Sequence, residues 1–331
     1  PHMSSIPRKM LIRFTGRHIL RNINKHEVIH YPPFLGVEEI INQGENMLRL
    51  ITVTGAFFLL LAYQAHAAEI TPYGTLNYKW SHDENASGVA YDKLENNGSK
   101  IGIDIIEPSI EGSSLNGIAK IEVGLDVDDS GSDTFDSRLA YAGLENNGVA
   151  ITVGRQSHDW VSKTGNFEVY GSNAVFKYGD RSSNTIKLDN GTLSAMAMVD
   201  GSSGQDGIDM WEASLSHSMN GIDVAVGYAD DVVNDISYWG AGASTTVGDL
   251  TIASTYTIKD AATDLEGMEA TISWKSLTVG YGDKEGTGTY MTYGVSHSMT
   301  DSLSVYAEMQ QDDLDTGTDL QHYSVGTKFT F

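Results

Sequence analysis

The chain has 331 residues, of which 44 are Asp or Glu and 21 are Lys or Arg, so its formal net charge is −23. Such acidity argues against binding to duplex nucleic acid, which needs a basic face to displace counterions. The chain contains no Cys, which excludes disulfide scaffolds, thiolate zinc sites and Cys nucleophiles.

The first recognisable element is a short apolar run at 51–62, ITVTGAFFLLLA. It follows the basic Arg49 and precedes Ala65-His66-Ala67, an order typical of a secretory signal peptide. The run is about half of the ~20 residues that a membrane-spanning helix needs. We therefore expect a signal peptide at 47–67 and a mature domain at 68–331. The alternative is a buried core helix.

Residues 1–46 precede this signal, where a signal peptide should have almost nothing. They are richer in Arg and Lys than the rest of the chain and are interrupted by Pro32-Pro33. Codons for Gln43 to Asn46 can contain a ribosome-binding site, AAGGAG, about five bases before the Met47 codon. We interpret 1–46 as an upstream extension that is not translated in the cell.

Beyond residue 67 the apolar residues alternate with polar ones almost throughout, which predicts strands with two different faces. In 99–106, for example, three isoleucines alternate with Lys100, Gly102 and Asp104. No segment of this region has a helical apolar stripe longer than two turns. The region is therefore expected to be all-β.

The connections between these strands alternate between short turns and longer acidic loops. Asn147-Gly148, Asn190-Gly191 and Asn220-Gly221 are strong hairpin signals, because Asn and Gly accept positive φ. The longer loops are expected at 81–98, 128–134, 156–183, 201–209, 230–234, 259–264, 283–288 and 312–319. One connection, 107–116, is long where a short turn belongs.

Counting these segments predicts 16 strands, with short turns on one rim and long loops on the other. That plan is typical of a transmembrane β-barrel of the bacterial outer membrane, with both termini on the short-turn side. Aromatic residues near strand ends suit the interfacial girdles of such a barrel: Trp80, Trp211, Tyr228, Trp239, Trp274, Tyr281 and Phe331. A large soluble sandwich or jelly roll is the alternative.

The stretch FDSRLAYAGLENNGVAITVGRQ at 135–156 resembles the general porins of Gram-negative outer membranes. Further similarity lies in YGTL at 73–76, SKIGI at 99–103 and VGTKFTF at 325–331, so the resemblance covers the mature chain in order. It implies a 16-stranded antiparallel barrel, usually trimeric, with the third external loop folded into the lumen. It also implies that Phe329 and Phe331 form a signal read by the barrel-assembly machinery after delivery by periplasmic chaperones.

The same resemblance implies a pore constriction, in which acids of the third loop face a basic ladder on the wall. The positions that match the ladder are Lys100, Arg138, Arg155 and Arg181. The candidate loop acids are Asp159 and Glu168. Enteric members carry Pro-Glu-Phe-Gly-Gly in this loop, whereas this chain has NFEVYG at 166–171.

Alternation gives an independent reading of which side chains face the lumen. Lys100 and Asp104 oppose Ile101 and Ile103, while Arg181 shares its phase with Lys187, so these four are expected to point inward. Arg138 opposes Leu139 and Tyr141 and is expected inward for the same reason. Arg155 shares its phase with Ile151 and Val153, so it faces inward only after a bulge or a strand end.

These features predict an outer-membrane porin for passive diffusion of small hydrophilic solutes and ions, with a weak cation preference from its acidity. No catalytic constellation or nucleotide fingerprint is present, so we expect no enzymatic activity and no cofactor. Acidic external loops are expected to bind divalent cations loosely and to bridge them to lipopolysaccharide. The alternatives are a sugar- or phosphate-specific channel and a non-conducting barrel that serves as an adhesin or anchor.

Overall fold

The computed structural model describes residues 68–85, 87–108, 114–126, 134–159, 174–200 and 207–331. The chain divides into two units, 1–64 and 65–331, and the description concerns the second. The proposed extension and signal peptide at 1–67 lie outside the described residues. Among those described, no helix is long and apolar enough to cross a membrane.

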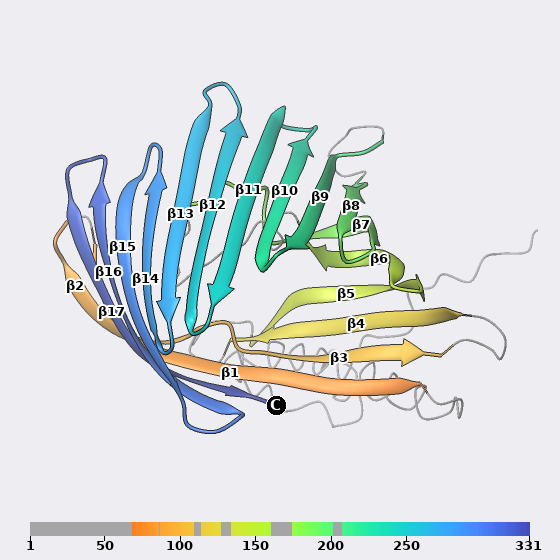
Figure 1. Cartoon of the computed structure of the whole chain (residues 1–331), viewed down its shortest axis with the longest axis horizontal. Helices are drawn as coiled ribbons and strands as arrows, with labels where there is room; N and C mark the ends of the chain where they lie inside the picture. The colour runs from red at the N-terminus through yellow and green to blue at the C-terminus, as the bar shows by residue number, and fades with distance from the viewer. Residues whose placement is uncertain (1–67, 86, 109–113, 127–133, 160–173, 201–206) are drawn as a thin grey trace, which may run out of the picture. The chain divides into compact units, whose positions relative to one another are not determined.

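The described part of the chain forms a single antiparallel sheet whose strands follow one another in chain order (Figure 1). These strands are β1 (Glu69–Glu84), β2 (Ala90–Asn96), β3 (Lys100–Glu107), β4 (Leu115–Leu125), β5 (Phe135–Asn146), β6 (Val149–Ser157), β7 (Arg181–Asp189), β8 (Leu193–Met198), β9 (Met210–Met219), β10 (Ile222–Asp231), β11 (Ile236–Val247), β12 (Leu250–Asp260), β13 (Leu265–Trp274), β14 (Leu277–Lys284), β15 (Gly288–Ser298), β16 (Leu303–Leu314) and β17 (Asp319–Thr330).

The sheet closes on itself, because β1 pairs with β17 from Thr75 opposite Thr330 to Asp83 opposite His322. On its other edge β1 pairs with both β2 and β3. These two are therefore halves of one wall strand, interrupted at 97–99, where Gly98 has a φ of 81°. Counted in this way, the wall is an all-β, closed antiparallel barrel of 16 strands, which confirms the predicted strand number.

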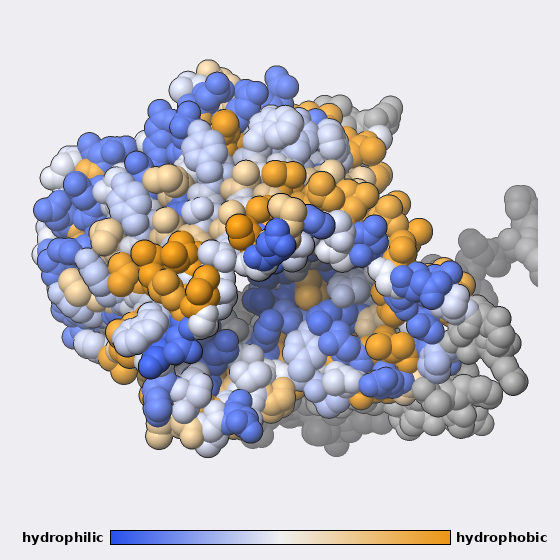
Figure 2. Space-filling view, viewed as in Figure 1, coloured by the Kyte–Doolittle hydropathy of each residue, from blue (hydrophilic) through white to orange (hydrophobic). Residues whose placement is uncertain are grey.

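The wall has an apolar outer face and a polar inner face, as the alternation predicts. Apolar side chains such as Val153, Val226 and Trp239 are more than half exposed on the outside. Polar side chains such as Glu122 and Thr257 are almost completely buried on the inside. Figure 2 shows hydrophilic residues within the opening and apolar residues beside it. A barrel in a membrane has this inverted arrangement, because lipid surrounds its outer face and water fills its lumen. Its closed sheet also satisfies the backbone hydrogen bonds of every strand.

The short turns are confirmed by their backbone angles, since Asn147, Gly148, Asn220 and Gly221 all have positive φ. Several predicted long loops are shorter than expected. The loop predicted at 81–98 is mostly wrong, because this range contains the end of β1 and all of β2. β1 has 16 residues, whereas about 9–11 suffice to cross a bilayer. Where hairpins extend into water, both faces are polar, so alternation does not mark the strands.

Candidate functional site: the charged lumen

The buried carboxylate of Glu122 organises one side of the lumen. Arg138 donates from Nε to Oε1 at 2.6 Å, and the ammonium of Lys100 lies 3.1 Å from Oε2. Tyr73 donates its hydroxyl to Oε2 at 2.9 Å. Only 3% of the Glu122 side chain is exposed. The cluster therefore joins β1, β3, β4 and β5 and sets two cations against one anion on the inner wall.

The backbone explains how Tyr73 reaches two strands away. Tyr73 lies opposite Gly102, and Gly102 lies opposite Glu122, so the three residues form a row across β1, β3 and β4. A Cβ at Gly102 would lie 2.5 Å from the Tyr73 ring, so only Gly lets the ring pass over β3.

Two similar crossings occur elsewhere in the barrel. Tyr290 passes over Gly282 and donates its hydroxyl to Glu269. Tyr306 passes over Gly326 and donates to Asn77 Oδ1 at 2.8 Å. Each crossing links three adjacent strands through one side chain, so the inner wall is cross-braced at three places.

Arg138 faces the lumen, but not for the reason that alternation suggests. The pairing of β4 with β5 shifts register at Glu122 and Val123, so Arg138 and Leu139 do not occupy ordinary alternating positions. Leu139 and Tyr141, expected on the outer face, instead line an inner recess with Lys120 and Lys187. The outward assignment of these two residues was therefore wrong, because the bulge reverses the phase.

The other two members of the predicted ladder lie near this cluster. Arg155 donates to the Ser137 carbonyl and the Ser183 hydroxyl, each at 3.1 Å. The register between β6 and β7 shifts between Gly154 and Gln156, beside Arg155. Within the described part of the chain, no ion pair joins Arg181 to an acid, although Arg138, Arg155 and Glu122 act on it electrostatically.

The candidate loop acids are only partly described. Asp159 lies against Lys187, with 2.6 Å between Oδ2 and Nζ, and accepts a hydrogen bond from the Ser194 hydroxyl at 2.9 Å. The structure thus pairs Asp159 with Lys187 rather than with the four bases of the ladder. Glu168 lies outside the described residues. Asp104 pairs with Lys120 at 2.9 Å on the same inner face.

His158 and Glu212 hold the two ends of the third external loop together. His158 Nδ1 lies 2.8 Å from Glu212 Oε2, and its Nε2 lies 2.9 Å from the Ser182 hydroxyl. The other Glu212 oxygen accepts the Asp159 amide at 2.9 Å. None of the His158 side chain is exposed, and its ring meets that of Tyr178 edge-on at 5.3 Å. Sequence reasoning missed both Glu122 and Glu212, although Glu122 is in phase with Lys120 and Glu212 with Ser214.

The described end of this loop, 174–180, contacts β12 and β13, which are not neighbours of the strands that carry the loop. The Ala174 amide donates to Glu269 of β13 at 2.8 Å, and the Phe176 amide donates to Thr257 of β12 at 2.9 Å. Phe176 and Tyr178 pack beside the buried Tyr238 of β11. Asp180 ends the segment, and its Oδ1 lies 2.7 Å from the Nζ of Lys177. The hydrogen bond from this ammonium lowers the pKa of the Asp180 carboxyl.

A second charged cluster lies beside the closure of the barrel, where β2, β1, β17 and β16 follow one another in the sheet. Lys93 bridges Glu95 and Asp83 at 2.7 and 3.1 Å. His322 lies 3.1 Å from both Asp83 and Asp312. Among the described residues, no group of three or more His, Cys, Asp or Glu has a geometry that could hold a metal ion.

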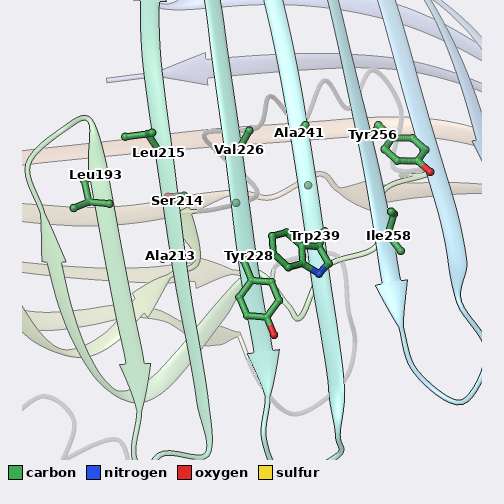
Figure 3. A pocket seen from close by; sticks show the side chains of 12 residues that line it. Leu193, Ala213, Ser214, Leu215, Val226, Tyr228, Trp239, Ala241, Tyr256 and Ile258 are labelled. Carbon is green, nitrogen blue, oxygen red and sulfur yellow. The ribbon is translucent and has the colours of Figure 1, made fainter.

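One hollow of about 400 Å³ lies on the outer face, between β8 and β12 (Figure 3). The small Ala213 and Ala241 lie among larger apolar side chains there, next to the rings of Tyr228 and Trp239, which contact each other with 4.4 Å between their centroids and their planes tilted by 55°. It lies on the apolar outer face rather than in the polar lumen, so it is no candidate for the path of a hydrophilic solute.

Comparison with known proteins assigns the family. The profile of the Gram-negative porins matches residues 53–331. This chain belongs to the Gram-negative porin family. No curated protein sequence matches it.

Solved porin structures share the fold. OmpT of Vibrio cholerae lacking loop L8 is 18% identical with a TM-score of 0.66, and the alignment covers 80% of this chain and 100% of that chain. An anion-selective porin from Comamonas acidovorans is 14% identical with a TM-score of 0.64, over 80% and 100%. OmpF of Salmonella typhi, in complex with daunomycin, is 13% identical with a TM-score of 0.64, over 79% and 97%.

The family establishes the general role. The protein is a non-enzymatic porin channel of the Gram-negative outer membrane that allows passive diffusion. The soluble sandwich considered from the sequence is thereby excluded.

Proposed function

We propose that this porin conducts small hydrophilic solutes and ions through a constriction formed where the third external loop folds into the lumen. The observation that carries the proposal is the hydrogen bonding of 174–180 to β12 and β13. The loop leaves the wall at β6 and returns at β7, whereas β12 and β13 lie five to seven strands further along the wall. A segment that bonds to both sides divides the lumen and narrows the water-filled path.

In this proposal the wall opposite the loop is the basic ladder of Lys100, Arg138, Arg155 and Arg181. Asp159 and Glu168 are the proposed acids of the loop, and Asp104 and Lys187 extend the charged surface of the lumen. Fixed charges of both signs orient dipolar solutes and favour those that keep their hydration. Glu122 offsets much of the charge of Lys100 and Arg138, and the remaining chain is strongly acidic. We therefore expect a weak cation preference.

The absence of Cys allows a direct test of the inward loop. The Phe176 amide donates to the Thr257 hydroxyl at 2.9 Å, which makes the two residues neighbours, so we expect the pair Phe176→Cys and Thr257→Cys to crosslink on mild oxidation more readily than a distant pair. The crosslinked porin should keep an open conductance in a planar bilayer, close to that of the reduced form. A control pairs Phe176→Cys with Thr246→Cys near the opposite end of the wall. Crosslinking of the control alone would contradict the inward loop.

We further propose a homotrimer, which is supported by the trimer form of the Vibrio cholerae OmpT structure. Conductance steps should then occur in groups of three. Phe329 and Phe331 are proposed as the signal for the assembly machinery. The exposed rings of both residues, 6.0 Å apart at the last strand, support this role. Residues 47–67 are proposed as the cleaved signal peptide.

The sugar- or phosphate-specific channel remains a second candidate, because the lumen offers both Lys and Asp side chains for hydrogen bonding. It predicts a saturable, ligand-induced block of conductance, whereas general diffusion predicts none. A folded barrel without conductance would instead favour the adhesin or anchor.

A further inference from the structure

The inner wall between β4 and β7 contains a recess of about 490 Å³. Its volume lies within the range of about 300–1,000 Å³ that is usual for small-molecule sites. One side is formed by β4 and β5, where Ile118, Leu139 and Tyr141 surround Lys120. The other side is formed by Lys187 and residues beside it. The recess therefore has an apolar half and a charged half.

The apolar half is unusual for its position. The interior of a pore is normally polar because it is filled with water. Here the half-buried Ile118, Leu139 and Tyr141 lie together on the lumen side. Water against such a surface is readily displaced by an apolar group, which gives a favourable free energy of burial.

The charged half carries both signs in fixed positions. Lys187 is held by Asp159 at 2.6 Å and by the Ser157 carbonyl at 3.4 Å, and Asp189 lies in the same lining. On the side formed by β4 and β5, Lys120 lies directly opposite Tyr141 and is held by Asp104 at 2.9 Å. An ammonium has three donors, so a Lys with a carboxylate partner can still donate to a solute.

We propose that this recess is a subsite for small zwitterions that carry an apolar side chain, the chemical class of the free aliphatic amino acids. This inference rests on the proposed diffusion function. The solute's carboxylate accepts from Lys187 or Lys120, its ammonium donates to Asp159 or Asp189, and its side chain covers Ile118 and Tyr141.

The balance of charges favours this class over its relatives. A solute with only a carboxylate makes no ion pair with Asp159 or Asp189, and one with only an ammonium makes none with the two lysines, so each loses part of the attraction that a zwitterion gains. A neutral hydrocarbon removes water from these charged groups without replacing its hydrogen bonds. Only a solute with both charges and an apolar body complements every part of the recess.

Saturation-transfer NMR on the folded barrel in detergent measures such weak binding without requiring conductance. Leucine should bind with a millimolar dissociation constant, roughly tenfold more tightly than glycine, which lacks the apolar side chain. 4-Methylpentanoate and 3-methylbutylamine, which each keep one of leucine's two charges, should bind more weakly than leucine. Equal binding of all four probes would overturn the inference.

Two variants locate the site. Ile118→Ser and Lys187→Gln should each weaken leucine binding roughly fivefold or more. Lys79→Gln is the matched control, because it removes the same charge from the inner wall near Glu95, outside the recess. Loss of binding in the control to the same extent would refute the assignment.

Single-channel recording separates this inference from the proposed function. Leucine should produce concentration-dependent current noise that Lys187→Gln reduces and Lys79→Gln does not. Normal conductance without leucine binding overturns the subsite and leaves the diffusion channel intact. Leucine binding to a barrel that does not conduct supports the subsite and overturns the proposed function.

Discussion

Replacing Glu122 with Gln should destabilise the barrel and make its selectivity more favourable to anions. The carboxylate lies 2.6 Å from Arg138 and 3.1 Å from Lys100. Glutamine keeps the shape and can still accept one hydrogen bond, but it leaves two neighbouring cations without their shared anion. Their mutual repulsion then acts on the inner wall.

The size of the effect follows from these distances. At an effective dielectric constant of about 20, each pair attracts by roughly 5–6 kcal/mol before desolvation is subtracted. Removing one partner of a buried pair usually costs about 3–5 kcal/mol. Because the lumen contains water and Gln keeps a hydrogen bond, we expect a loss of about 2–3 kcal/mol in the free energy of unfolding.

Urea unfolding in lipid vesicles measures this loss, and the reversal potential in a salt gradient measures the selectivity. Glu95→Gln is the matched control, because Glu95 also pairs with two lysines, at 3.2 and 2.7 Å, but is 22% exposed. Its loss should stay below about 1 kcal/mol, because solvent screens the pair. If Glu122→Gln is no more destabilising than the control, the role assigned to the buried cluster is wrong.

Three further predictions follow from individual contacts. Gly102→Ala should lower the unfolding free energy by about 1–3 kcal/mol, because the new methyl group displaces the Tyr73 ring above it. Gly117→Ala is the control: its Cβ would lie 3.4 Å from Glu107 Cβ, an ordinary contact, so the loss in the same urea titration should stay below about 1 kcal/mol. Glu212→Ala should increase the current noise of the open channel, because it leaves the buried His158 with one hydrogen bond fewer. Glu212→Gln should show less noise than Glu212→Ala, because glutamine can still hydrogen-bond to His158. Phe331→Ser should lower the yield of heat-modifiable barrel in cells while refolding in detergent stays near normal; an unchanged cellular yield would remove the proposed assembly role.

The predictions made from local pattern held where the membrane enforces that pattern. Lipid outside and water inside require apolar and polar side chains to alternate along each strand. The consecutive residues Lys100 and Ile101, like Ala225 and Val226, therefore already indicate the two faces. Asn-Gly turns likewise carry their own backbone signal, which explains why the turns at 147–148 and 220–221 were correct. Pattern reasoning failed at 81–98, where the hairpin leaves the bilayer and alternation is no longer required.

The charged site depended on relations that a single strand does not contain. Glu122 meets Lys100, Arg138 and Tyr73 only because register places β1, β3, β4 and β5 side by side, and a bulge turns Arg138 inward. Contact between 174–180 and β12 likewise joins positions about 80 residues apart in the chain.

The sequence by itself therefore determined the class of fold, the strand number and the sign of the overall charge, because each is a sum of local signals. Only the tertiary structure decided which charges meet in the lumen, since pairing depends on strand register, on bulges that change the phase, and on closure of the sheet between β1 and β17.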